Sequence, residues 1–319
     1  MYQNNNSKIK ECQEHLKKPT EKKLMQEVFL DFMSDKKIKL SRLADCGNVL
    51  RFLATKDKKN FKLSGGIFCH NRFCPLCSWI KAKKTAFEIL ELLEYARVLK
   101  KKEFIFITLT AKNVKAKDLK SEITDFNKSF KRLFETKNFE KINHGFIKKI
   151  EVTYNEERDD FHPHLHIIVA VNSSYFTSRD YISRAKLLEM WRKAKRDDSI
   201  TQVDVRKIHM NSIKEVLEIA TYSTKQNQLY SSKEIFDVLY TSLYRRQLLT
   251  FNKLFKELRK LQNLKELDLS ELVNLDEIRI KAELEIYYKF NEDLKNYEFD
   301  LEKEFTSEEE FYDLNLEID

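Results

Sequence analysis

The sequence predicts an α+β fold, in which a central antiparallel sheet is flanked by helices, and three observations support this. Apolar, β-forming runs at residues 104–110 and 145–154 are interleaved with an amphipathic helical stretch at 119–135. A polar turn at 155–160 joins the second run to a third one, which ends near Val171, and so predicts a hairpin. Gly and Pro are scarce, with 4 and 3 copies in 319 residues, which disfavours a loop-rich sandwich.

The remaining elements follow from the periodicity of apolar residues. The lysine-rich segment 1–38 contains helical patches, such as the one at 22–33, and is interpreted as an accessory arm. Residues 79–98 carry apolar side chains at helical spacing. Further helices are expected at 181–195, 212–225 and 232–261, a strand at 200–208, and a helical tail at 262–319.

Two histidines on the third strand form the most informative motif. His164 and His166 flank Leu165, and alternate side chains of a strand share a face, so the two imidazoles point the same way. Histidine is scarce here, with 7 copies, and a third one is at His162. Two neighbouring imidazoles on a rigid strand predict half of a divalent-metal site. The alternative is two histidines packed on a half-buried sheet.

The hairpin suggests a third ligand. If its turn is centred between residues 157 and 158, Glu151 lies opposite His164 and points to the same face. A His-His-Glu set suits Mg²⁺ or Mn²⁺. A one-residue slip would turn Glu151 away, in which case Asp160, Glu156 or His162 are the alternatives.

The helix at 212–225 carries residues suited to covalent chemistry. Ser212 and Glu215 have the spacing of a capping box. Glu218, Tyr222 and Lys225 share one face, since they are four and three residues apart. Tyrosine can act as a nucleophile, a carboxylate as a general base, and a lysine can stabilise negative charge. Taken alone, the same pattern also fits an ordinary solvated helix.

Four of the five cysteines form a cluster in the sequence. They are Cys46, Cys69, Cys74 and Cys77, with spacing C-x22-C-x4-C-x2-C. In a cytosolic protein this spacing favours a structural Zn²⁺ site over disulfides. His70 is an alternative ligand, four unrelated buried cysteines are the alternative interpretation, and Cys12 is expected to be a free thiol.

Charge is unevenly distributed along the chain. Residues 265–319 contain 19 acidic and 6 basic residues, whereas the remainder contains 53 basic and 32 acidic ones. A body this basic predicts a nucleic-acid partner, although basic surfaces also serve solubility. Candidate phosphate contacts are Arg72 and Lys81 near the cysteines, and Arg245 and Arg246 in the segment 232–261.

Two absences bear on localisation. The sequence has no run of 18 apolar residues, so no membrane span is expected. The first six residues are polar and contain no apolar signal core, which predicts a cytoplasmic protein.

The ordered motifs resemble a known family. They are residues 46–48 and 69–77, the strand 106–110, the His-Leu-His strand, Glu218 with 222–225, and, more faintly, 239–260. This set, spread over about residues 40 to 260, resembles the rolling-circle replication initiators of small bacterial plasmids, within the HUH endonuclease superfamily. The family usually has glycines near 251–253, where this chain has Phe-Asn-Lys.

The resemblance implies an activity. It implies a sheet of HUH type with the histidines at its centre, and metal-dependent nicking in which Tyr222 keeps the 5′ end as a phosphotyrosine. It further implies that Glu218 activates water at termination and that Lys225 stabilises charge. The implied partners are the double-stranded plasmid origin, the nicked single strand, a host helicase and the replication machinery.

Other functions compete with this interpretation. A single-tyrosine transposase or relaxase would share the histidine strand and the tyrosine. A non-catalytic, zinc-dependent DNA-binding regulator would bind duplex DNA without cleaving it. A metal hydrolase acting on small phosphoesters would explain neither the basic body nor the tyrosine helix.

The predicted organisation has four parts. They are a basic arm at 1–38, a zinc module with its helix at 39–100, a catalytic domain at 101–231, and a helical C-terminal region with an acidic tail at 232–319.

Overall fold

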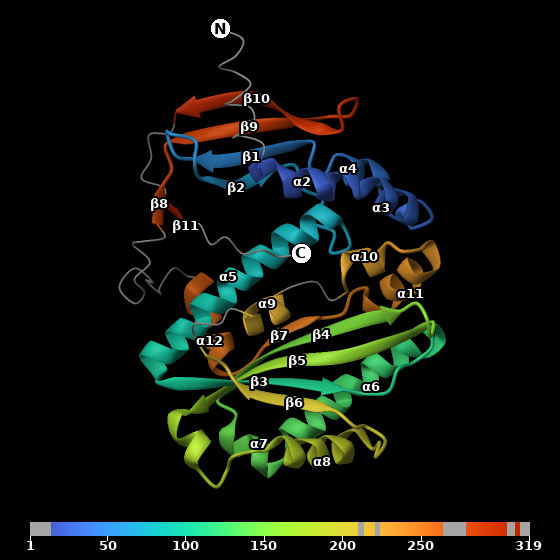
Figure 1. Ribbon diagram of the computed structural model, residues 1–319, viewed down its shortest axis with the longest axis vertical. Helices are drawn as coiled ribbons and strands as arrows, with labels where there is room; N and C mark the ends of the chain where they lie inside the picture. The colour runs from blue at the N-terminus through green and yellow to red at the C-terminus, as the bar shows by residue number, and fades with distance from the viewer. Residues whose placement is uncertain (1–13, 210–213, 221–223, 264–278, 305–309, 313–319) are drawn as a thin grey trace. The chain divides into compact units, whose positions relative to one another are not determined.

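The computed structural model describes residues 14–209, 214–220, 224–263, 279–304 and 310–312 (Figure 1). The chain divides into two compact units. Unit 1 comprises residues 1–81 and 273–319, and unit 2 comprises residues 82–272. Helix α5 (Pro75–Lys100) contains the boundary.

Unit 2 is built on a five-stranded antiparallel sheet with the order β6-β3-β5-β4-β7. Its strands are β3 (Lys102–Thr110), β4 (Gly145–Asn155), β5 (Asp160–Asn172), β6 (Val203–Lys207) and β7 (Leu249–Phe251). The histidine strand β5 is therefore central. Together with the helices this confirms the prediction of an α+β fold with an antiparallel sheet.

The two faces of this sheet have different roles. Leu165, Ile167 and Val169 point to one face and are fully buried. Helices α6 (Ala116–Phe134), α7 (Lys137–Ile142) and α8 (Arg184–Lys195) cover that face, as Figure 1 shows. The short helix η1 (Ser173–Thr177) follows β5. His164 and His166 point to the opposite face, near α9 (Lys214–Ala220).

The hairpin has the predicted register. Glu151 pairs with His164, and Asn155 pairs with Asp160 at the turn. Directly paired residues point to the same face, so Glu151 and the two histidines share one side of the sheet. The geometric prediction about Glu151 is confirmed.

The stretch 232–261, expected to be one helical segment, is interrupted. It forms α11 (Lys233–Leu243), strand β7 and α12 (Leu254–Asn263), after a short helix α10 (Gln226–Leu229). The strand forms because Thr250 pairs with Lys148 on β4, a partner that the local sequence does not reveal. At the next turn Lys253 takes a left-handed backbone with φ of 45°. Its Nζ donates to the Asn143 carbonyl at 2.8 Å, so the turn forms without the glycine usual in the family.

Unit 1 contains a four-stranded antiparallel sheet with the order β10-β9-β1-β2. The strands are β1 (Val49–Ala54), β2 (Phe61–Gly66), β9 (Leu284–Asn291) and β10 (Asn296–Glu304). The same unit contains helices α2 (Glu14–Leu24), α3 (Gln26–Met33) and α4 (Leu40–Ala44). A two-stranded sheet pairs β8 (Arg279–Lys281) with β11 (Glu310–Tyr312). Thus helices of the expected N-terminal arm belong to the same unit as the cysteines.

The prediction of a helical C-terminal region is wrong for residues 284–304. They form the β9–β10 hairpin, whose strand β9 pairs with β1. The physical reason is a two-residue alternation, in which Leu284, Ile286 and Tyr288 are buried while the residues between them are not. High acidity concealed this pattern in the sequence.

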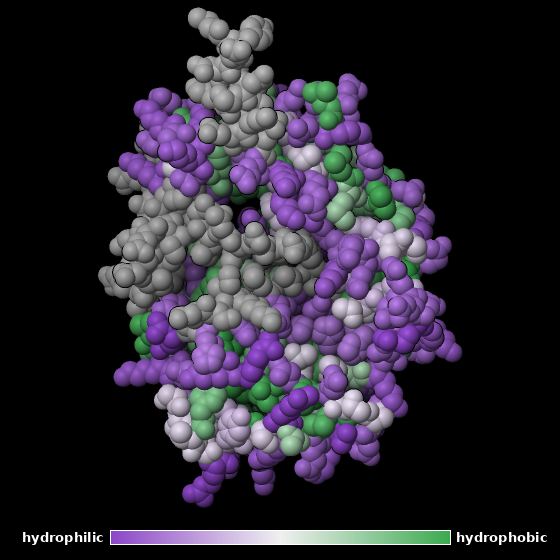
Figure 2. Space-filling model, viewed as in Figure 1, coloured by the Kyte–Doolittle hydropathy of each residue, from purple (hydrophilic) through white to green (hydrophobic). Residues whose placement is uncertain are grey.

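The surface of the described residues is mostly polar. Figure 2 shows hydrophilic side chains over most of the coloured area of the drawn face. Among the described helices, none has both the length and the apolar character that a membrane crossing requires.

Candidate active site and cysteine cluster

Three side chains converge on the histidine face of unit 2. Oε2 of Glu151 lies 3.0 Å from Nε2 of His166 and 3.4 Å from Nε2 of His164. The ligand atoms of all three residues lie within 4.8 Å of one another. The side chains are only 9–13% exposed. The sequence predicted this trio, and the structure brings it together.

The protonation of this trio favours a cation. Burial lowers the pKa of His166, so its imidazole stays neutral. Burial opposes ionisation of Glu151, but the hydrogen bond from His166 and the positive charge of Lys149 outweigh it and hold the pKa of that carboxyl well below its usual range. Nδ1 of His164 lies 3.2 Å from the carbonyl oxygen of His162, and because a carbonyl only accepts, Nδ1 must donate.

The donor set fits a divalent metal ion. When Nδ1 of neutral His164 carries the proton, Nε2 presents a lone pair to the Glu151 carboxylate at 3.4 Å. Two lone pairs facing each other repel unless a proton or a cation lies between them. One carboxylate oxygen and two imidazole nitrogens are ligands for Mn²⁺, and also suit Mg²⁺ completed by water.

Glu218 is held beside this trio by an arginine that the sequence analysis missed. Nη2 of Arg206 donates to Oε1 of Glu218 at 3.0 Å, and Nε donates to Oε1 of Glu215 at 3.0 Å. Nη1 donates to Asp204 at 2.6 Å, and the guanidinium lies 4.6 Å above the ring of Phe106. Arg206 on β6 therefore fixes α9 over the sheet. The alternation of Val203 and Val205 would have placed Arg206 on this face.

Lys149 is a second residue that the sequence analysis missed. It pairs with His166 across the β4–β5 ladder and is 2% exposed. Its Nζ donates to the backbone carbonyl of Glu218 at 3.4 Å. Burial lowers the pKa of Lys149 to about 8, while Glu151 and Glu218 act against that shift. Its position two residues before Glu151 was the available signal.

The other residues predicted on the 212–225 helix are placed differently. Tyr222 and Ser212 lie outside the described residues. Lys225 precedes α10, and its side chain is exposed. Glu218 thus lies near the histidines, whereas Lys225 precedes a different helix.

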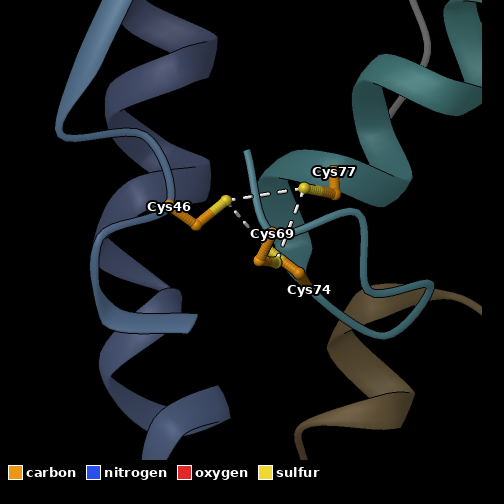
Figure 3. Close-up of side chains that lie close together, drawn as sticks. All are labelled: Cys46, Cys69, Cys74 and Cys77. Atoms are coloured by element: carbon orange, nitrogen blue, oxygen red, sulfur yellow. Dashed lines mark hydrogen bonds between the residues drawn. The ribbon is translucent and has the colours of Figure 1, made fainter. Parts of the chain in front are cut away.

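In unit 1 the four predicted cysteines meet (Figure 3). Sγ of Cys46 lies 3.4 Å from that of Cys77 and 3.7 Å from that of Cys74, and Sγ of Cys69 lies 3.7 Å from that of Cys77. These separations are too long for disulfides, whose S–S bonds are about 2.05 Å. They match the edge of a tetrahedron with metal–sulfur bonds of about 2.3 Å, which is roughly 3.8 Å. Exposed His70 is not a member of this group.

Polar contacts brace the cysteine cluster. Nζ of buried Lys23 donates to the carbonyls of Ala44 and Cys46, at 3.2 and 3.0 Å. The hydroxyl of Tyr297 on β10 donates to the carbonyl of Gly47 at 2.7 Å. Gly47 has φ of 79°, and a Cβ there would lie 2.5 Å from Leu76. The predicted Cys-Gly-Asn motif therefore needs its glycine for a left-handed turn and close packing.

The predicted DNA-contacting residues divide into two kinds. Arg72, Lys81 and Arg245 are exposed. Arg246 is half-buried, and its Nη2 donates to the Lys120 carbonyl at 2.9 Å and to the Thr124 hydroxyl at 3.0 Å. Arg246 is thus hydrogen-bonded to α6, and its contact with DNA stays a prediction.

Known proteins identify the class to which this arrangement belongs. The profile of the family described as "Replication protein" matches residues 60–298. This chain belongs to that family, which confirms its resemblance to plasmid replication initiators.

Three similar relatives are each named "Protein rep". The chain is 40% identical over 222 residues to a "Protein rep" of Staphylococcus aureus, covering 69% of this chain and 97% of that one. It is 34% identical over 246 residues to a "Protein rep" of Streptococcus pneumoniae, covering 73% and 75%. A third, from Bacillus amyloliquefaciens, is 30% identical over 263 residues, covering 75% and 77%. No solved structure matches the chain.

Proposed function

We propose that this protein nicks the origin of a plasmid in a metal-dependent reaction and transfers the strand through a 5′-phosphotyrosine, so that it both initiates and terminates rolling-circle replication. The observation that carries the proposal is the convergence of Glu151, His164 and His166 on the sheet face that α9 contacts. Membership of the replication-protein family supports DNA as the substrate. The sheet would then be of HUH type.

The proposed role of the Glu-His-His cluster is to hold a metal ion at the reacting phosphate. Glu151, His164 and His166 would hold Mg²⁺ or Mn²⁺, which when bound polarises a phosphoryl oxygen. Three protein ligands on one face leave the remaining positions for substrate and water. In unit 1, Cys46, Cys69, Cys74 and Cys77 would hold a structural Zn²⁺ with no open position.

Tyr222 is the proposed nucleophile. The sequence places it two residues after the end of α9 and four after Glu218. Its hydroxyl loses a proton to solvent and its oxygen attacks phosphorus, which forms the P–O bond to tyrosine and breaks the P–O3′ bond, and the departing O3′ takes up a proton from solvent. The freed 3′-hydroxyl primes a polymerase, and the covalent link conserves the phosphodiester for rejoining. Lys225 would stabilise the developing negative charge.

Glu218 is the proposed base for termination. Its carboxylate lies beside His166, with Oε2 3.9 Å from Nδ1, and Arg206 holds it there. Activating a water in place of a second tyrosine would release the protein after one round.

Exposed Arg72, Lys81 and Arg245 would contact the origin and the nicked strand. A host helicase and the replication machinery would act on the nicked product.

A cleavage assay tests the proposal. Supercoiled plasmid carrying the chain's own origin is incubated with Mg²⁺ or Mn²⁺ or with EDTA, and a denaturing protein gel reveals any DNA adduct. The proposal predicts a metal-dependent nick and an adduct, both lost in Tyr222→Phe, whose DNA binding stays nearly intact. Tight origin binding without nick or adduct would favour a DNA-binding regulator. Normal nicking by Tyr222→Phe would refute the tyrosine assignment.

A further inference from the structure

The Nδ1 atoms of the two histidines in the candidate metal site have different hydrogen-bond partners. Nδ1 of His164 faces the carbonyl oxygen of His162, which can only accept a hydrogen bond. Nδ1 of His166 faces the hydroxyl of Thr108 on β3, at 3.2 Å. A hydroxyl can either donate or accept. His164 is therefore fixed in one tautomer, whereas His166 is not.

The geometry points to Thr108 as a positioning residue for the metal site, which holds His166 with Nε2 directed at Glu151 and permits its ring proton to change place when a divalent cation binds. This inference rests on the proposed metal site and assigns a task to the strand 106–110. Thr108 pairs directly with His166 across the β3–β5 ladder, so the contact is built into the register.

The exchange follows from the contacts of His166. Without a cation, Nε2 carries the proton and donates to Glu151 at 3.0 Å, while Nδ1 accepts from the Thr108 hydroxyl. A cation on Nε2 requires that nitrogen's lone pair, so the proton leaves for solvent and Nδ1 takes one up. The Thr108 hydroxyl then rotates and accepts from Nδ1. The ring keeps its orientation in both states.

Other neighbours of His166 do not replace this contact. Oε2 of Glu218 lies 3.9 Å from Nδ1, beyond hydrogen-bond distance. The ring of Phe106 stacks against the imidazole with centroids 5.5 Å apart, which restrains tilt but offers no hydrogen bond. Among the described contacts of His166, Thr108 is the group within hydrogen-bond distance of Nδ1.

Direct binding of Mn²⁺ tests the assignment. Free Mn²⁺ is measured by electron paramagnetic resonance during titration of the full-length, zinc-loaded protein. Thr108→Val keeps the shape of the side chain but removes the hydroxyl, and should weaken Mn²⁺ binding roughly 10- to 100-fold, as loss of an outer hydrogen bond to a ligand does. Thr108→Ser should restore affinity to within about threefold of wild type. Unchanged affinity in Thr108→Val would overturn the inference.

Thr110→Val is the matched control. Thr110 lies on the same strand and face and pairs with His164, but its hydroxyl donates to the Gln202 carbonyl at 2.7 Å. Its removal should leave Mn²⁺ binding unchanged, and an equal loss in both variants would overturn the assignment. Wild-type binding that Glu151→Gln does not weaken would show instead that the metal site itself is wrong.

A readout on the wild-type protein avoids any folding defect of the variants. With ¹⁵N-labelled histidine, nuclear magnetic resonance should show the His166 proton on Nε2 without metal and on Nδ1 with Mg²⁺. The His164 proton should be on Nδ1 in both states. A His166 proton on Nδ1 in both states would contradict the exchange.

Discussion

The two candidate metal sites of this chain are opposites. In unit 1, the sulfur of Cys46 lies 3.7 Å from that of Cys74 and 3.4 Å from that of Cys77, and the sulfurs of Cys69 and Cys77 lie 3.7 Å apart, so the four cysteines supply a full set of four ligands. In unit 2, Glu151, His164 and His166 lie on adjacent strands and approach from one side. Structural sites use all positions for protein ligands, whereas catalytic sites leave one open. Ligand number and direction therefore distinguish a candidate structural metal site from a candidate catalytic one.

The surroundings of the two sites differ in the same sense. Lys23 and Tyr297 donate to backbone carbonyls around Cys46, which braces the loop. Around the histidines, Arg206 and Thr108 contact the side chains that would act. One environment fixes the chain, and the other orients chemical groups.

The largest effect is expected at the cysteine cluster. Cys74→Ser removes a buried ligand, and binding of structural zinc contributes on the order of 10 kcal/mol to folding in small metal modules. Hydrogen exchange should therefore show loss of protection in β1 and β9, while β5 stays protected. Cys12→Ser, outside the predicted cluster, is the control. If β1 is as well protected in Cys74→Ser as in wild type, the cysteine cluster does not stabilise the fold of unit 1.

Glu151→Gln should have the next largest effect, on activity rather than stability. Loss of the anionic ligand removes metal-assisted charge stabilisation worth several kcal/mol, so nicking should fall about a hundredfold or more. The unfolding midpoint should change little. Glu157→Gln, in the exposed hairpin turn, is the matched control. Nicking of wild-type rate by Glu151→Gln would remove this residue from the reaction centre.

Glu218→Ala should separate the two halves of the reaction. Nicking and adduct formation should persist, whereas hydrolytic termination should fall about 10²- to 10⁴-fold, which is the usual contribution of a general base. Single-turnover assays on origin oligonucleotides measure each step. Glu215→Gln alters the other α9 carboxylate held by Arg206 and should spare termination. Equal loss of both steps in Glu218→Ala would point to a structural role.

The smallest effect is a pH dependence confined to unit 1. Burial lowers the pKa of His15 to about 4, and its ring stacks on Phe61 with centroids 3.7 Å apart. The unfolded chain protonates His15 near pH 6.5, whereas the folded chain does so only near pH 4. The stabilisation of the folded state that comes from keeping His15 neutral is therefore fully present above pH 6.5 and is lost as the pH falls towards 4. Between pH 7 and pH 5 the loss is up to about 2 kcal/mol.

Replacing His15 tests that dependence. Denaturant unfolding at pH 7 and pH 5 should show a smaller decrease in stability for His15→Phe than for wild type. The exposed His209 of unit 2 gives the control, since His209→Gln should leave the decrease unchanged. Identical pH dependence in His15→Phe and wild type would exclude His15 as the source.

The sequence predicted the cluster of Glu151, His164 and His166 because its geometry is local. His164 and His166 alternate on one strand, and the four-residue turn at 156–159 sets Glu151 opposite His164. Two-residue alternation and hairpin register need no information from elsewhere in the chain. The cluster of four cysteines could also be predicted from the sequence, because the spacing of cysteines along the chain indicates a candidate metal site of this kind.

The sequence analysis failed where pairing is long-range. Strand β9 pairs with β1 across more than 230 residues of chain, as in the pair Arg51–Tyr287. Strand β7 was hidden inside an apparent helix, because Arg245 and Lys253 take left-handed backbones without a glycine as a signal. Thr108 and Arg206 were missed because their importance lies in what they contact across the sheet.

Mapping the covalent attachment site tests the central claim most directly. After nicking of origin DNA with Mn²⁺, the adduct is digested with nuclease and protease, and the modified peptide is sequenced by mass spectrometry. The account predicts a phosphotyrosine at Tyr222, absent with EDTA and in Glu151→Gln. An adduct at another residue, such as Tyr230, or metal-dependent cleavage that leaves no adduct, would contradict it.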